Sequence, residues 1–230
     1  MIISRKALTK GNTRMRVTSF GVFCLTTVGN LGSDCMKWPI HWEKRTSITH
    51  PIKVDWITNP RMTGKIGITL CPGKCQPISW SGGWNRDLET DVARLSGMEV
   101  HTIISLIEQK EMEELQVPNL GDVIQKHKIS WIHLPIPDTT VPTNEAMENL
   151  ESLKDAIVNS LLSEEKVVVH CKGGLGRAAT IVCMILNWFN VSTKQSIDHI
   201  RKVRSPDCVN PKQEEFLLKN CQVNIRANGQ

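Results

Sequence analysis

The fold is decided by residues 167–180, VVVHCKGGLGRAAT. Three consecutive valines predict a strand buried on both faces, which is typical of the centre of a parallel sheet. Three glycines then allow a tight turn, and a helical pattern follows Arg177. A glycine-rich turn between a strand and a helix directs backbone N–H groups inward, at the positive end of the helix dipole. The stretch therefore predicts an α/β fold with an anion-binding loop.

The sequence around this stretch alternates short β-rich runs with longer helical patterns. We predict strands at 53–57, 67–70, 100–106, 131–135 and 166–170, and helices at 86–95, 111–117, 120–127, 145–162, 178–189, 194–203 and 212–221. Ser192 with Gln195, and Asn210 with Gln213, are capping-box signals for two helix starts. The expected fold class is α/β, with a central, mainly parallel sheet flanked by helices.

Composition narrows the class of protein. The chain has 230 residues, 40% hydrophobic and 22% charged, which fits a soluble globular domain. Its formal charge is +5, but the basic residues are spread along the chain, so we predict no nucleic-acid partner. No apolar run approaches the roughly 20 residues that cross a bilayer, so we predict no membrane span.

The cysteines and histidines suggest neither a disulfide scaffold nor a metal site. Eight cysteines are too dilute in a chain of this length for a disulfide framework, so we expect reduced thiols and a cytoplasmic location. Cys71 and Cys75 lack a second pair at zinc-site spacing, and the histidines are scattered. We predict no metal and no cofactor. The sequence leaves open whether Cys183, Cys208 or another thiol pairs with Cys171 on oxidation.

The first 33 residues are basic and contain no Asp or Glu. This pattern is found in transit peptides, and its basic-then-apolar order in secretory signals, either of which would mean import or export. A disordered tail or a misplaced start codon explains it more simply, since no helical or strand periodicity is present. We expect an N-terminal extension over residues 1–50 and one domain over residues 51–230.

The loop carries a candidate nucleophile, Cys171. Inward N–H dipoles and the nearby Arg177 favour the thiolate form of the cysteine. Arg177 follows six residues later, so the curled loop returns its planar guanidinium to two oxygens of a bound phosphate. The expected phosphate-binding residues are Lys172, Gly173, Gly174, Leu175, Gly176 and Arg177, with His170 as an auxiliary residue. The simpler alternative is a buried cysteine followed by an ordinary glycine turn.

Attack on a phosphate ester also requires a proton donor, because an unprotonated alkoxide or phenoxide is a poor leaving group. Asp138 lies in the proline-bracketed loop PIPDTTVP, just after the strand predicted at 131–135. It is our candidate acid, although Asp beside proline also shapes turns without catalysis. Gln213 is an auxiliary candidate that would orient the hydrolytic water or simply complete a capping box.

The segment HCKGGLGR resembles the signature of the protein tyrosine phosphatase superfamily. Together with PIKVDWI, GITLCPGK, VPNL and PIPD, it is similar to the dual-specificity type, and in particular to the kinase-associated phosphatase (cyclin-dependent kinase inhibitor 3) family. The likeness covers roughly residues 51–220. It implies metal-free hydrolysis of phosphothreonine, phosphoserine or phosphotyrosine through phosphocysteine, with a cyclin-dependent kinase as a possible phosphorylated partner.

Two positions bear on how far this resemblance carries. Many relatives have Ser or Thr directly after the signature arginine, where a hydroxyl helps the thiolate to leave; Ala178 stands here, which implies slower hydrolysis of the intermediate. Thr180 is no obvious substitute, since two residues along a helix point the side chain away. Lys172 resembles a lysine of phosphoinositide phosphatases, but Leu175 replaces their second loop lysine.

Three other functions remain as alternatives. One is a phosphoinositide phosphatase, and another is a module that binds phosphoproteins with little turnover. A rhodanese or arsenate reductase would use a similar cysteine loop, but is disfavoured because His170, Arg177 and a separate PIPD loop occur together.

Overall fold

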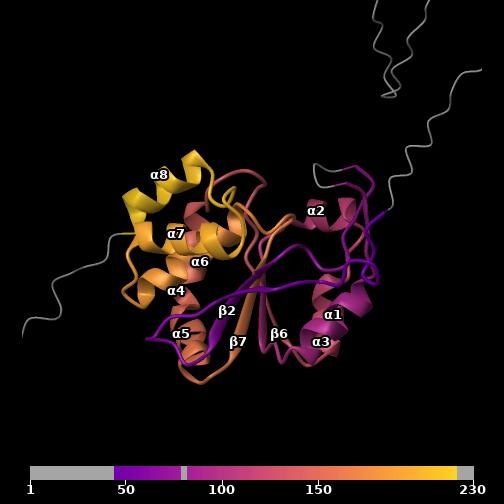
Figure 1. The fold of residues 1–230 in the computed structure, drawn as a ribbon, viewed down its shortest axis with the longest axis horizontal. Helices are drawn as coiled ribbons and strands as arrows, with labels where there is room; N and C mark the ends of the chain where they lie inside the picture. Colours follow the sequence, from indigo (N-terminus) through magenta and orange to yellow (C-terminus); the bar gives the residue numbers. More distant parts are fainter. Residues whose placement is uncertain (1–43, 79–81, 222–230) are drawn as a thin grey trace, which may run out of the picture. The chain divides into compact units, whose positions relative to one another are not determined.

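A computed structural model describes residues 44–78 and 82–221. Its main sheet has five strands in the order β1-β2-β7-β5-β6 (Figure 1). Their bounds are Asp55–Ile57 (β1), Lys65–Thr69 (β2), Lys166–His170 (β7), Thr102–Ser105 (β5) and Ser130–His133 (β6). Only the edge strand β1 pairs antiparallel; the other pairs are parallel. The predicted α/β class with a mainly parallel sheet is confirmed.

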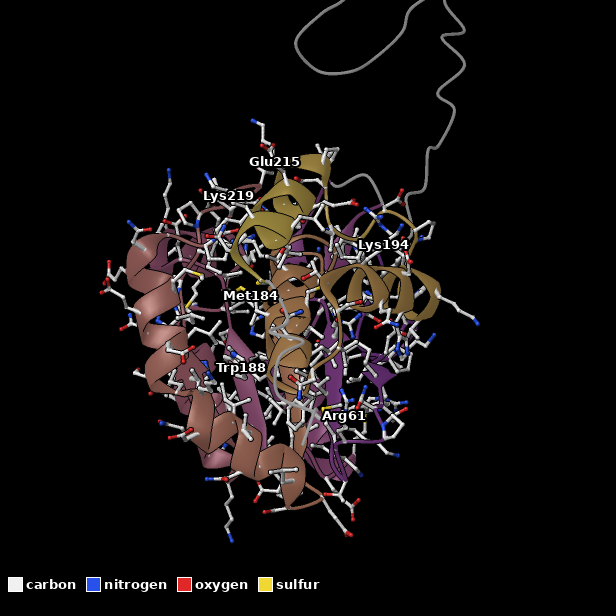
Figure 2. The ribbon with its side chains drawn as sticks, turned by 90° about the vertical axis from the view of Figure 1, so that its left-hand side faces the viewer. Arg61, Met184, Trp188, Lys194, Glu215 and Lys219 are labelled. Carbon is white, nitrogen blue, oxygen red and sulfur yellow. The ribbon has the colours of Figure 1, made fainter. Side chains whose placement is uncertain are left out.

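Helices cover both faces of this sheet. They are α1 (Leu88–Gly97), α2 (Gln109–Glu114), α3 (Leu120–Lys126), α4 (Asn144–Ser152), α5 (Lys154–Leu162), α6 (Arg177–Trp188), α7 (Thr193–Val203) and α8 (Pro211–Asn220). Helices α1 to α3 lie on one side and α4 to α8 on the other (Figure 1). On the second side, α6 runs between the α4–α5 pair and α7, and α8 lies across the upper end of α6 in Figure 2, where Met184 and Trp188 mark α6.

The position of β7 at the centre of the sheet explains the continuous apolar run in its sequence. Val167 and Val169 belong to the core beneath α4 to α8, whereas Val168 belongs to the core beneath α1 to α3. All three side chains are fully buried. Because successive strand residues point to opposite faces, a strand covered on both sides must be apolar at every position.

The register of the parallel strands gathers several chain segments at one edge. His170 at the end of β7 lies opposite Thr69 of β2 and Ser105 of β5. The segments that follow β2, β5, β6 and β7 therefore all leave the sheet at the same edge, where these strands end. Crevices at the carboxyl ends of parallel strands are where α/β proteins bind ligands, so this edge is where the functional site is expected.

A small second sheet, absent from the sequence-based prediction, closes one side of this edge. Strands β3 (Cys75–Gln76) and β4 (Trp84–Asn85) pair antiparallel, and each is too short to show a period of two. Arg45 bridges to Trp84, so the chain joins the domain before residue 51. The extension predicted over residues 1–50 otherwise lies outside the described residues, up to residue 43.

The predicted helix at 145–162 is two helices, which is a correction to the sequence-based assignment. Helix α4 ends at Ser152 and α5 begins at Lys154. The Leu153 N–H is shared between the carbonyls of Asn149 and Leu150, and the Ser152 hydroxyl also donates to the Asn149 carbonyl, at 2.7 Å. Local side-chain bonds of this kind compete with the helical ladder and bend it. Both predicted capping boxes are present.

Most of the remaining boundaries move by one to three residues from those predicted, as is usual at helix and strand ends. Within the described part of the chain, no helix is long and apolar enough to cross a membrane.

The turn after β2 rests on a buried ion pair between Arg86 and Asp91. Two N–H···O contacts join them, Nε to Oδ2 at 2.7 Å and Nη2 to Oδ1 at 2.8 Å, and both side chains are 1% exposed. The same carboxylate accepts a hydrogen bond from the Gly73 N–H at 2.9 Å. The pair therefore joins the start of α1 to the turn at residues 71–75.

Replacing Asp91 by asparagine should destabilise the domain by about 3 kcal/mol, because it leaves the buried Arg86 guanidinium without its counter-charge. Urea unfolding at pH 7 measures this difference. The matched control is Asp198→Asn on the exposed face of α7, which should change the unfolding free energy by about 0.5 kcal/mol or less. Equal effects of the two substitutions would contradict the structural role given to the buried pair.

Candidate active site

The loop between β7 and α6 is shaped by one glycine. Gly174 has a φ of +70°, and a Cβ there would lie 2.4 Å from the Thr69 carbonyl oxygen, so another residue would not fit without displacing β2. The Gly174 N–H donates to the Cys171 sulfur at 3.2 Å. The loop thus presents a backbone donor to a sulfur atom at its centre, an arrangement that stabilises a thiolate.

The carbonyls of the loop are held on its outer side by Arg204, which follows α7. Its guanidinium donates to the carbonyl oxygens of Gly173 and Gly174, each at 3.1 Å. Asp55 on β1 anchors the same guanidinium at 2.6 Å. Because a peptide's C=O and N–H point in opposite directions, fixing these carbonyls outward directs the following N–H groups inward.

Arg177, at the first position of α6, is 2% exposed. Glu111 of α2 binds it through both oxygens, at 2.5 and 2.9 Å, and the Ile136 carbonyl accepts a further hydrogen bond at 2.8 Å. Burial would raise the pKa of the Glu111 carboxyl, but the hydrogen bonds and charge of Arg177 outweigh it and hold that pKa below its usual value. The pair is therefore ionised and fixes the guanidinium plane.

Asp138 reaches the same guanidinium from the loop after β6. Its Oδ1 lies 2.7 Å from Nη2 of Arg177, and its side chain is half-exposed. The next residue, Thr139, has a φ of +61° and donates its N–H to Oδ1 of Asp138 at 2.9 Å. A β-branched residue in the left-handed region is strained, and such strain is concentrated at functional sites.

His170 lies beneath the loop and is fully buried. Trp131 donates its indole N–H to the Ser105 hydroxyl at 2.8 Å, and this hydroxyl lies 2.7 Å from His170 Nε2. The hydroxyl proton is then free to bond Nε2, which leaves the ring proton on Nδ1, facing the Cys171 carbonyl at 3.4 Å. Burial lowers the pKa of His170 to about 4, so the ring is neutral at physiological pH.

The structure brings most of the predicted site residues to one cavity of about 780 Å³. The predicted residues that line it are Cys171, Lys172, Gly173, Leu175, Gly176, Arg177, Asp138 and Gln213. Two other predicted site residues do not line the cavity. Gly174 donates its N–H to the Cys171 sulfur, and His170 is buried behind the loop. Within the described part of the chain, no three His, Cys, Asp or Glu residues gather as a metal site.

Gln213 has the predicted capping-box contacts and a further contact with the Asp138 loop, while its role in orienting water stays a prediction. It completes the capping box with Asn210, and its Nε2 donates to the Thr140 carbonyl at 3.0 Å. Its amide also lies 3.0 Å from where a Cβ on Gly176 would be. The side chain thus links α8, the Asp138 loop and the phosphate loop.

Residues 76–218 match the family model described as "PTP-SAK: Swiss Army Knife protein, DSP-PTPase phosphatase domain". The chain belongs to this phosphatase family. It is 29% identical to cyclin-dependent kinase inhibitor 3 of Mus musculus over 173 residues, which covers 73% of this chain and 77% of that protein. The Rattus norvegicus protein of the same name is 28% identical over 174 residues, with the same coverage.

A solved structure of kinase associated phosphatase, in which the catalytic-site cysteine is substituted by serine, shares the fold. Its TM-score is 0.64 at 24% identity, over 72% of this chain and 92% of that one. The predicted family is confirmed, and the chain is a cysteine-dependent phosphatase of the dual-specificity protein tyrosine phosphatase class.

Three features of this phosphatase site were not found from the sequence. Glu111 is one of several acidic residues on α2, Arg204 is one of several basic residues near the end of α7, and Lys74 lies in a turn that the sequence-based assignment left unexplained. Each acts through a contact between segments far apart in the chain. No local pattern distinguishes such a residue from an exposed charge.

His170 gives the phosphatase a pH-dependent stability. Between its pKa of about 4 in the folded protein and about 6.5 in the unfolded chain, the unfolded state binds more protons, so stability falls as the pH falls. We expect the difference in unfolding free energy between wild type and His170→Gln to narrow by about 2 kcal/mol from pH 7.5 to pH 5. Urea titrations at both pH values test this, and a constant difference would contradict it.

Arg204→Met should lower kcat/KM by about 100-fold, because the loop N–H groups lose the contacts that aim them at the phosphate. The inhibition constant for inorganic phosphate should rise in parallel. Lys202→Met, on an exposed position two residues earlier, is the control and should retain wild-type values. Unchanged phosphate inhibition in a folded Arg204→Met protein would show that Arg204 does not hold the loop.

Proposed function

We propose that this chain hydrolyses phosphate monoesters in proteins through a phosphocysteine intermediate, with Cys171 as nucleophile, Arg177 as phosphate clamp and Asp138 as acid. One observation carries this proposal. Cys171 and Arg177 from the loop after β7 and Asp138 from the loop after β6 line a single cavity, and Asp138 lies 2.7 Å from the arginine that would hold the phosphate. A candidate acid beside the leaving-group position and a candidate nucleophile within the loop are what the reaction needs.

The first step transfers the phosphoryl group to sulfur. The Cys171 thiolate attacks phosphorus, the bond from phosphorus to the ester oxygen breaks, and Asp138 gives that oxygen its proton. Arg177 and the inward N–H groups bind the equatorial oxygens, where negative charge is spread in the transition state. Glu111 keeps the guanidinium in place throughout.

The second step returns the thiolate. Water attacks the phosphocysteine, Asp138 now accepts the water's proton, and the bond from phosphorus to sulfur breaks. We propose that Gln213 orients this water, and the contact of its amide with Gly176 in the cavity lining supports this role. Ala178 is buried in the core, and the Thr180 hydroxyl donates to the Gly176 carbonyl at 3.0 Å, so neither supplies a donor for the leaving thiolate.

The substrate we propose is a phosphorylated protein, with a cyclin-dependent kinase as the first candidate. Support comes from the similarity to proteins named cyclin-dependent kinase inhibitor 3 and from the shared fold with kinase associated phosphatase. Leu175 also occupies the loop position where a second lysine would favour an inositide, and it is 37% exposed beside the cavity. An apolar side chain there suits a peptide better than a polyanion.

Steady-state hydrolysis of paired phosphothreonine and phosphotyrosine substrates, with EDTA present, tests this function. The substrates are a threonine-phosphorylated cyclin-dependent kinase and a phosphotyrosine peptide. Cys171→Ser should abolish turnover, since its hydroxyl is a poor nucleophile at neutral pH. Asp138→Asn should lower kcat by roughly 100-fold or more, because it removes the proton donor.

The same assay separates the alternatives. EDTA-resistant turnover that survives in Cys171→Ser would contradict the thiol mechanism. Strong competition by phosphatidylinositol phosphates over phosphopeptides would replace the protein substrate with a lipid. Tight phosphopeptide binding by the wild type, without phosphate release, would indicate a binding module.

A further inference from the structure

The turn at residues 71–75 lies beside the active-site loop and has a fixed backbone. Gly73 has a φ of +69°, and a Cβ there would lie 2.5 Å from the Leu88 Cβ. The Lys74 N–H donates to the Cys71 carbonyl at 3.4 Å, and the Lys74 carbonyl accepts from the Arg86 N–H at 3.3 Å. With the Gly73 N–H bound to Asp91, the turn is held from both sides.

This turn places one lysine side chain in the cavity. Lys74 is 4% exposed, and it lines the same cavity as Cys171. Its Nζ donates to the Lys172 carbonyl at 3.3 Å, so the ammonium lies against the first peptides of the phosphate loop. The Trp84 ring lies 5.3 Å away, a distance at which the face of an indole attracts a cation.

No carboxylate of the described residues forms an ion pair with Lys74. Among the ion pairs of residues 44–78 and 82–221, Arg177 is paired with Glu111 and Asp138, Arg204 with Asp55, and none includes Lys74. A buried ammonium without a carboxylate is costly, and burial lowers the pKa of Lys74; Cys71 and Cys171 partly offset this, whereas the charges of Lys172 and Arg86 lower the pKa further. One of its three N–H donors binds the Lys172 carbonyl, which leaves two.

The reaction needs this extra charge. A phosphate monoester carries about −1.5 to −2 charges near pH 7, and the thiolate adds another. The pair of Arg177 and Glu111 is formally neutral, so the clamp brings geometry but little net charge. A cation in a low-dielectric cavity reduces the repulsion between the two anions far more than one in water.

Resting on the phosphatase function above, we propose that Lys74 is a further catalytic residue, whose ammonium faces the Cys171 thiolate and donates to a non-bridging oxygen of the phosphoryl group. The small sheet β3–β4 is then part of the active site, because it carries Trp84 and closes the turn over the loop. Lys172 lies on the loop itself and is less buried, so it does not provide the same fixed charge.

Two variants remove the charge while keeping the packing. Lys74→Met retains the apolar stem against Trp84, and Lys74→Gln retains a donor for the Lys172 carbonyl. Lys110→Met, on an exposed position of α2, is the matched control. The variants are first compared by thermal melting, and the readouts below use those that fold.

The first readout is binding of inorganic phosphate, measured by calorimetry in the Cys171→Ser background, where no thiolate and no turnover contribute. We expect both Lys74 variants to weaken phosphate binding by about tenfold, the order of one charge-assisted hydrogen bond.

The second readout is the rate of alkylation of Cys171, measured by mass spectrometry of the peptide that contains it. The ratio of the rate with anionic iodoacetate to the rate with neutral iodoacetamide should fall by about tenfold, because a local positive charge attracts only the anion.

Neither readout depends on a phosphopeptide substrate, so a failure of the proposed protein substrate leaves this test valid. An unchanged phosphate affinity in both Lys74 variants would overturn the proposal, and so would an unchanged alkylation ratio. A purely structural role for Lys74 would lower the melting temperature without altering that ratio.

Discussion

The ion pair between Arg177 and Glu111 is the constraint on which the site depends. A guanidinium at the start of α6 must be buried to reach a phosphate held in the loop, and a buried cation without a partner is strongly unfavourable. Glu111 offsets that cost through two hydrogen bonds and fixes the orientation of the guanidinium. The loop after β5, which carries Glu111 through α2, is therefore as necessary to the site as the loop with the cysteine.

Two further arginines near the cavity are also held by a carboxylate. Asp55 anchors Arg204, which holds the carbonyls of the phosphate loop, and Asp91 anchors Arg86, which holds the turn carrying Lys74. Arginine suits all three places because its planar fork bonds a carboxylate and backbone carbonyls at once. The pairs of Arg177 and Arg204 join segments far apart in the chain, and Asp91 also binds the Gly73 N–H, so positive charge is gathered around one site on side chains that are held in place.

Three residues at this edge of the sheet have a left-handed backbone conformation. Gly73, Gly174 and Thr139 all have positive φ, and each belongs to a segment that follows a parallel strand. The two glycines adopt this conformation at little cost and allow close approach to Leu88 and to the Thr69 carbonyl. Thr139 does so against its steric preference, next to Asp138, which is consistent with a loop whose geometry is set by the site rather than by local propensity.

The sequence by itself determined the layers of the fold and the centre of the site. The apolar run 167–169 required a strand covered on both faces, and the glycine spacing after Cys171 required an anion-binding turn, because both are local effects of side-chain pattern and backbone freedom. The capping boxes at Ser192 and Asn210 were readable for the same reason. The break between α4 and α5 at Leu153 could not be predicted from the sequence, because it arises from competing hydrogen bonds within one turn.

Only the tertiary structure decided which charges serve the site. Glu111, Arg204 and Lys74 are ordinary residues of charged segments in the sequence. In the fold, Arg204 and Lys74 line one cavity, and Glu111 holds the Arg177 guanidinium that lines it too. Their positions depend on contacts across more than sixty residues, such as that of Arg177 with Glu111, at a separation of 66. Local pattern encodes the strand, the turn and the helix, whereas the compensation of buried charge depends on which segments the fold brings together.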